Sequence, residues 1–204
     1  IANSPKQTFM TKVQPGDIKY KDVNKDGVID IYDRTAIGFP FTPEIMMGLG
    51  GYFSYKGLDM FFNFTGVTNR GIYLDNEGMF PYMLEYPNYN ILRDYYDNRW
   101  IPGADDNSRA KYPAVIAGTN PNNYQLSTLY MRDASYLKLK NAEVGYTLPH
   151  KWTQPIGIQN ARFFVNGANL LTFDKIKIVD PEFISVVGGY PQQRVLNVGA
   201  QIDF

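Results

Sequence analysis

Apolar and polar residues alternate along the last nine positions of the chain. Leu196, Val198, Ala200, Ile202 and Phe204 are apolar, and polar or small residues stand between them. Because successive side chains of a strand point to opposite faces, this stretch predicts a strand with one apolar and one polar face. Its final aromatic ring suits a strand whose apolar face meets lipid and whose end lies at the membrane interface.

The same alternation predicts four further strands upstream. They span residues 47–55, 58–65, 135–148 and 161–173. The first two flank the short Lys56-Gly57 segment, and two alternating runs around such a turn indicate a hairpin.

The predicted strand over residues 135–148 changes its pattern midway. Its apolar residues occupy odd positions at Leu137 and Leu139, and even positions at Ala142, Val144 and Tyr146. One extra residue in a β-bulge would produce this change. A strand with different surroundings at its two ends would also produce it, and the pattern alone favours neither explanation.

The connections between the strands differ greatly in length. Residues 1–21 read as an irregular segment and residues 149–160 as a turn, whereas residues 68–134 and 174–194 form long connections. Within the longest one, Ile91–Trp100 has the approximate spacing of a short helix. Transmembrane barrels combine short periplasmic turns with long external loops. With the C-terminus on the periplasmic side, the two long connections and the segment before residue 47 are expected outside.

Five strands of this type do not close on themselves, since a membrane barrel needs at least about eight. An open sheet would leave its edges and its apolar face exposed. We therefore expect the chain to be a fragment whose neighbouring strands lie upstream. It begins at Ile1 without a signal peptide, so an exported protein would require a further N-terminal part.

Composition excludes several classes of function. Lys plus Arg equals Asp plus Glu at 20 each, so there is no basic field to attract nucleic acid. The sequence contains no cysteine and only one histidine, His150, which lies in a predicted turn. No nucleophile–base pair and no phosphate-binding glycine loop is apparent. We therefore expect no enzymatic activity.

The strongest local motif is an acidic stretch over residues 22–33. It matches the twelve-position calcium loop, with a glycine, Gly27, at the sixth position. The predicted ligands are the side chains at positions 1, 3, 5, 9 and 12 and the backbone carbonyl at position 7, namely Asp22, Asn24, Asp26, Asp30, Asp33 and Val28. Position 12 is Asp where Glu is usual, which gives a shorter last ligand. An acidic turn without an ion is the alternative.

Aromatic and charged residues gather in the longest connection. They are predicted contacts for a ligand or a lid protein: Tyr89, Tyr95, Tyr96, Asp97, Arg99 and Trp100. Packing of this loop against itself is the competing explanation.

Several short stretches, taken in their order along the chain, resemble the C-terminal part of the SusC/RagA-type TonB-dependent outer-membrane transporters. The resemblance runs from about residue 15 to the end of the chain. The matching stretches are Pro15–Thr35, Ile37-Gly38, Asp97–Trp100, Asp133–Asn141, Gly145–Pro149, Gly167–Phe173 and the terminal Phe204.

This resemblance implies an all-β fold, as the C-terminal strands of an antiparallel transmembrane barrel of about 22 strands with long extracellular loops. Residues 1–204 would be one portion of the barrel domain, with an extracellular segment and calcium loop at 1–46 and strands and loops at 47–204. The implied activity is import of oligosaccharides or peptides across the outer membrane of a Gram-negative bacterium. The implied partners are a SusD-like lipoprotein, the missing plug and barrel portion, TonB through that missing part, and outer-membrane lipid.

A secreted soluble β-sandwich that binds glycan with the help of calcium is the alternative. Both classes predict alternating strands, but a sandwich needs about seven short ones. The five predicted here are mostly longer, which favours the barrel.

Overall fold

The computed structural model describes residues 4–74, 91–116, 118–177, 180–182, 190 and 192–204. The chain divides into two compact units. The first contains residues 1–38, 73–132 and 185–188, and the second contains residues 39–72, 133–184 and 189–204. No helix in the described ranges has the length and hydropathy needed to cross a membrane.

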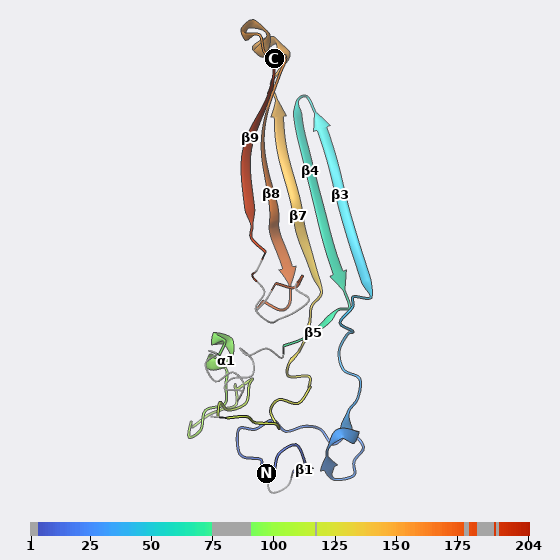
Figure 1. Cartoon of the computed structure of the whole chain (residues 1–204), viewed down its shortest axis with the longest axis vertical. Helices are drawn as coiled ribbons and strands as arrows, with labels where there is room; N and C mark the ends of the chain where they lie inside the picture. The colour runs from blue at the N-terminus through green and yellow to red at the C-terminus, as the bar shows by residue number, and fades with distance from the viewer. Residues whose placement is uncertain (1–3, 75–90, 117, 178–179, 183–189, 191) are drawn as a thin grey trace. The chain divides into compact units, whose positions relative to one another are not determined.

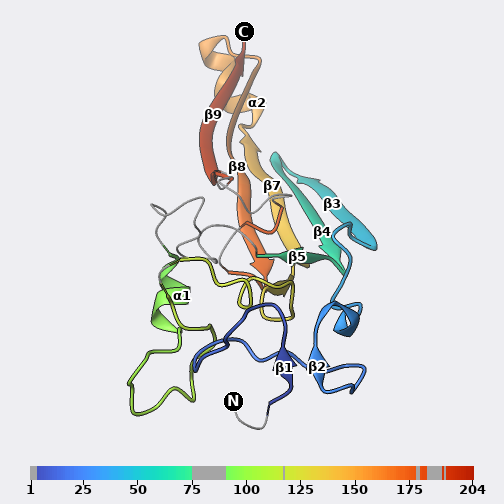
Figure 2. The same cartoon turned by 60° about the horizontal axis from the view of Figure 1, so that its bottom comes forward.

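The second unit is built on one antiparallel sheet, whose strands run side by side in Figures 1 and 2 in the order β3-β4-β7-β8-β9. Its strands are β3 (Ile45–Tyr55), β4 (Leu58–Thr68), β7 (Tyr136–Thr147), β8 (Asn160–Asp174) and β9 (Val195–Asp203). All five predicted strands are therefore confirmed, with boundaries that differ from the prediction by three residues or fewer. β3 and β9 form the two edges, and a single sheet of this kind is not a two-layer sandwich.

The β3–β4 hairpin closes as the sequence predicts. Tyr55 pairs with Leu58 across the turn, and both turn residues have positive φ, 48° at Lys56 and 87° at Gly57. Two consecutive positive φ values define the turn that matches the natural twist of paired strands. The backbone N–H of Thr147, the last residue of β7, donates to the Gly57 carbonyl at 2.7 Å and so connects the hairpin turn to β7.

A β-bulge explains the change of pattern in β7. Leu139 pairs with Phe64 of β4, but Asn141 pairs with the adjacent Asn63, so Lys140 is an extra residue. The pairing of β7 with β8 shifts at the same place. Of the two explanations that the pattern left open, the structure selects the bulge.

The connection from β7 to β8 is helical rather than a simple turn. It contains the short helix α2 (His150–Thr153) and the 3-10 helix η2 (Gln154–Ile156), which ends at Gly157 with φ 75°. The Trp152 N–H donates to the Pro149 carbonyl at 2.9 Å. Such a short helical segment gives too little hydrophobic periodicity to be recognised in the sequence.

The first unit consists mainly of loops with small elements. These are β1 (Lys6–Gln7), which pairs in parallel with β2 (Val28–Ile29), the 3-10 helix η1 (Ile31–Asp33) and α1 (Arg93–Asp97). α1 confirms the predicted short helix within Ile91–Trp100. Two strands that the sequence pattern did not predict, β5 (Gly71–Tyr73) and β6 (Met131–Asp133), pair with each other.

Buried amides hold the loops of the first unit together. Asn120 and Asn123 donate their side-chain N–H groups to one oxygen of Asp17, at 2.7 and 3.0 Å. Asn122, fully buried, donates to the Ile18 carbonyl at 2.9 Å. Since buried polar groups are costly unless they are paired, these bonds join the loops beside buried apolar and aromatic residues such as Ile29 and Tyr130.

Candidate functional site

The apolar face of the sheet is exposed. One cross-strand row on it runs Phe53, Met60, Val144, Val165 and Val198, with exposed fractions from 42% to 84%. Single exposed apolar residues are ordinary, but five strands that share a continuous apolar face mark a surface that meets a partner or lipid. This arrangement agrees with the prediction from the alternating pattern.

The opposite face carries a network of charged and amide side chains that links four strands. Arg162 of β8 forms a forked pair with Asp59 of β4 and donates to Glu143 of β7 at 2.6 Å. Asn166 of β8 donates to the other oxygen of Glu143 at 3.0 Å, and Asn197 of β9 donates to Asn166 at 3.0 Å. Forked arginine–carboxylate pairs fix geometry as well as supplying energy, so this network holds the register across the sheet.

Glycines make room for the larger side chains on this polar face. Gly145 lies beside the Arg162 guanidinium, where a Cβ would come within 2.3 Å of Nη2. Gly199 lies under the Phe164 ring, where a Cβ would come within 2.4 Å of Cζ. Phe164 breaks the alternation in the sequence, and its ring covers a glycine on the neighbouring strand.

The polar face contains a cavity of about 450 Å³ near the β3–β4 turn. Its lining combines the ion pairs with aromatic and small polar side chains: Tyr52, Ser54, Gly57, Asp59, Phe61, Glu143, Thr147, Arg162 and Gln201. Phe61, the second residue that breaks the alternation, is therefore a wall of this cavity. Nothing in the sequence alone marks these residues as neighbours, because they come from all five strands.

The acidic loop is organised by its own carboxylates. Asp22 accepts from the backbone N–H groups of Lys25 and Gly27 at 2.6 and 2.9 Å, and Asp33 accepts from those of Val23 and Asp30 at 2.7 and 2.9 Å. These bonds fold the twelve residues into a closed turn with both ends joined.

The remaining predicted ligands take part in the same turn. Asn24 and Asp26 bond to each other's backbone or side chain, and Asp26 also accepts from the Val28 N–H at 2.8 Å. Asp30 caps η1 by accepting from the Tyr32 N–H at 2.8 Å. Across the part of the chain that the structure describes, no three Asp, Glu, His or Cys side chains are grouped closely enough to hold a metal ion.

The pKa of the Asp33 carboxyl is lowered. The largest cause is the hydrogen bond from the Asp30 backbone, which burial opposes and the Val23 and Asn24 backbones reinforce. The ionised form is therefore the one that the loop stabilises. Each carboxylate oxygen has two lone pairs, so oxygens that accept one N–H still have capacity for a cation.

The predicted aromatic contacts occupy different environments. Tyr95 is buried, its ring stacked on Tyr112 with centroids 4.7 Å apart, and its hydroxyl donates to the Pro113 carbonyl at 3.3 Å. Tyr95 therefore packs the loop. Tyr96 is 53% exposed and lies under the Arg99 guanidinium, 3.8 Å from the ring centroid.

Of the other predicted contacts, Asp97 is exposed and Trp100 is half-buried. The Trp100 ring packs over Gly16, where a Cβ would come within 2.5 Å of it. Tyr89 lies outside the described residues. Tyr96, Asp97, Arg99 and Trp100 thus stay available as surface groups, whereas Tyr95 does not.

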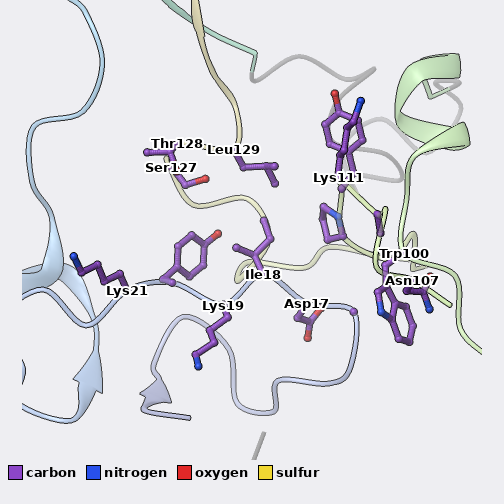
Figure 3. Close-up of a pocket in the computed structure, with 15 residues that line it drawn as sticks. Asp17, Ile18, Lys19, Lys21, Trp100, Asn107, Lys111, Ser127, Thr128 and Leu129 are labelled. Carbon is purple, nitrogen blue, oxygen red and sulfur yellow. The ribbon is translucent and has the colours of Figure 1, made fainter.

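A cavity of about 610 Å³ lies beside Trp100 in the first unit (Figure 3). Lys19, Lys21 and Lys111 stand around it, but Figure 3 shows their side chains pointing in three directions. The ammonium groups do not converge, so this cavity has no concentrated positive charge. Ser127 and Thr128 give it a neutral, hydroxyl-bearing wall.

Known proteins resemble the chain over nearly all of its length. It is 28% identical to TonB-dependent receptor P26 of Formosa agariphila over 93% of the chain, and 30% identical to TonB-dependent receptor P3 of the same organism over 93%. It is 23% identical to TonB-dependent receptor SusC of Bacteroides thetaiotaomicron over 97%. The chain spans about a fifth of the length of these relatives.

Solved structures give the same result. The RagAB peptide importer in the open-open state aligns with a TM-score of 0.62 and 26% identity, over 91% of this chain and 20% of that one. The RagAB peptide transporter aligns with a TM-score of 0.63 and 25% identity. No family model matches the chain.

Proposed function

We propose, on the premise that this chain is a segment of a SusC/RagA-type TonB-dependent receptor, that its sheet is part of the barrel wall of an outer-membrane importer. The all-β, antiparallel fold fits that premise, and the relatives are receptors and transporters rather than enzymes. The predictions of a receptor fragment and of no catalytic activity are therefore both confirmed.

One observation supports this function above the others: the sheet is apolar on its exposed face and ion-paired on the other. A soluble protein buries its apolar face and solvates its polar one. In a membrane barrel the outward face meets lipid and the inward face is polar. Val198 of β9 is 84% exposed on the apolar face, whereas Arg162 of the adjacent strand β8 forms two ion pairs on the polar face.

The substrate class that we propose is oligosaccharides, with peptides as the second candidate. The names of the related receptors, SusC among them, do not specify a cargo, whereas the RagAB structures are of a peptide importer. An exposed aromatic such as Tyr96 and the hydroxyl-bearing wall of the cavity at Ser127 and Thr128 suit sugars, whose recognition combines ring faces with hydrogen bonds.

Uptake by the full-length protein tests this proposal. Cells that express it would be given labelled oligosaccharide and peptide mixtures, with and without a functional TonB. Accumulation of oligosaccharide only when TonB is present is the expected result. TonB-dependent accumulation of peptide alone would replace the substrate class, and no TonB-dependent accumulation of either would reject import. A full-length protein that stays folded and monodisperse without detergent would support the soluble glycan-binding alternative.

We propose that a SusD-like lipoprotein contacts the exposed Tyr96–Arg99 pair. Aromatic and arginine side chains are enriched at the centres of protein interfaces. Replacing Tyr96 by Ala in the full-length protein is expected to weaken co-purification of the lipoprotein. Asp105→Ala, another exposed position of the first unit, serves as the control. Equal co-purification by both variants would remove Tyr96 from the contact.

We also propose that calcium binds the loop over residues 22–33, drawing together carboxylates that are not grouped closely enough in this structure, and has a structural role there. The support is the ligand order around Gly27 and the closed turn that Asp22 and Asp33 form, as described above. Isothermal titration of the full-length protein at millimolar calcium is expected to detect binding that the paired change Asp22→Asn and Asp26→Asn abolishes. The pair Asp105→Asn and Asp106→Asn is the matched control. Unchanged binding in the loop variant would place any calcium elsewhere.

A further inference from the structure

A lysine of β7 is almost completely buried, while the residue before it is exposed. Lys138 is 1% exposed, whereas Leu137 before it is 40% exposed. Lys138 lies on the polar face, opposite Thr65 of β4 and Thr172 of β8 in the register. Something must therefore cover the polar face at this end of the sheet.

The cover is the described stretch Asp180–Glu182 of the connection between β8 and β9. The Lys138 ammonium donates to Glu182 at 2.7 Å and to Asp180 at 3.2 Å. Lys140, the bulge residue, donates to the same Glu182 carboxylate at 2.8 Å and to the Gln192 side chain at 3.0 Å. The Tyr136 hydroxyl adds a weaker bond to Glu182 at 3.4 Å.

A third cation, which follows the end of β4, binds the same stretch. The guanidinium of Arg70, a residue only 5% exposed, donates to the Pro181 carbonyl at 2.5 Å and lies 5.5 Å from the centre of the Phe41 ring. Three consecutive residues are thus held by two lysines of β7 and by an arginine that follows β4.

Other ion pairs of this connection are different in kind. Lys175 and Lys177, in pairs with Asp133 and Asp174, are 73% and 68% exposed, so water competes with both bonds. Burying Lys138 costs desolvation energy that an apolar residue of similar size would avoid. An ionic contact at a buried position is therefore a poor choice for simple packing, but it is one that protonation of its carboxylates can release.

We infer that Asp180–Glu182 form a strap, held over the polar face by Lys138, Lys140 and Arg70, whose release uncovers that end of the face. This inference rests on the proposed function for its consequence: if the polar face lines the passage of an importer, the strap narrows the passage and its release widens it. The strap itself is a property of the sheet and can be tested without transport.

The charge on Glu182 sets the pH range of the strap. Burial raises the pKa of the Glu182 carboxyl, but the hydrogen bonds and charges of Lys138 and Lys140 outweigh it, and the pKa lies below its ordinary value. Asp180 and Tyr136 are the other titratable groups that face it. A carboxyl with a lowered folded pKa stabilises the closed form above its unfolded pKa, and this contribution is lost as pH falls through the lowered value.

A thiol placed beneath the strap reports its opening. The chain has no cysteine, and Thr65, the partner of Lys138 in the register, has a buried hydroxyl oxygen. Thr65→Cys in the detergent-solubilised full-length protein would be labelled with a hydrophilic maleimide, alone and together with Glu182→Gln. Ser54→Cys, exposed on the same face near the β3–β4 turn, is the reference thiol.

Glu182→Gln is expected to raise the labelling rate at position 65 at least tenfold and to leave the rate at position 54 unchanged. Lys175→Gln, which removes an exposed pair of the same connection, is expected to change neither. Lys140→Met provides a second release variant that leaves Lys138 in place. Unchanged labelling at position 65 in both release variants, with folding verified by heat-modifiable migration, would overturn the strap. Faster labelling without any change in uptake would keep the strap and reject only its role in passage.

Discussion

At the scale of single residues, backbone conformation and close approach decide which positions tolerate change. Gly57 combines both constraints: its φ is 87°, and a Cβ would come within 2.6 Å of the Thr147 carbonyl oxygen. Gly103 shares only the first, with φ 75° and open space around it. The two positions therefore separate conformational strain from collision with backbone.

We expect Gly57→Ala to destabilise the full-length protein clearly more than Gly103→Ala. The left-handed conformation costs an alanine about 1–2 kcal/mol at either position. Collision with a carbonyl that belongs to the sheet adds to this at Gly57 only, because backbone of paired strands cannot move aside. Thermal unfolding in detergent, followed by loss of heat-modifiable migration, would measure both variants. Equal losses would show that the hairpin relaxes around the new methyl group.

Asp33 gives a pH-dependent prediction at the same scale. Its folded pKa is lowered, so the order that it contributes is present above the ordinary carboxyl pKa and is lost as pH falls through the lowered value. Hydrogen exchange of a peptide that covers residues 22–33, corrected for the intrinsic pH effect, is expected to accelerate in that acidic range. Asp33→Asn should exchange rapidly at every pH, whereas Asp97→Asn should behave like the parent protein. A flat profile in the parent would mean that the Asp33 bonds do not order the loop.

At the scale of elements, alternation predicted the sheet well because a strand with two different faces has a strict period of two. The connections of the first unit had no such period, and β5, β6 and α2 are three or four residues long, too short to show one. The acidic loop could be found because its carboxylate and amide residues are close in sequence. The cluster of Asp59, Glu143 and Arg162 could not, since its members come from three strands that only the register brings together.

That cluster predicts strong coupling between β4 and β8. Arg162 satisfies carboxylates on two strands, so removing it leaves both without their main partner. We expect Arg162→Gln to destabilise the protein, because hydrogen bonds to charged groups are stronger than those between neutral groups. A double-mutant cycle with Asp59→Asn is expected to give clear non-additivity. The cycle of Lys175→Gln with Asp133→Asn, at a mostly exposed pair, should be near zero, and additive effects at Arg162 would contradict the role in register.

At the scale of the whole molecule, the apolar and the ion-paired face of the sheet require surroundings of different polarity. Phe204 is 83% exposed next to the edge strand β9, on the apolar face. In the full-length protein we expect Phe204→Ala to lower the amount assembled in the outer membrane several-fold, because the interfacial ring is lost. Tyr190→Ala, at a residue 76% exposed in a loop, is the control. Surface labelling of intact cells would measure the amount of each variant in the outer membrane. Equal amounts of the two variants would show that the Phe204 ring does not contribute to assembly.

The bulge at Lys140 has a consequence for the whole face pattern of β7. Residues before it and residues after it are out of step by one position, and Lys140 absorbs the difference. If Lys140 instead took an ordinary paired position, with the turn at 148 held fixed, every residue before it would turn to the opposite face, placing Leu139 in the polar interior and Lys138 toward lipid. The bulge at Lys140 thus keeps the apolar side chains of β7 on the lipid-facing side of the sheet and its charged side chains on the polar face.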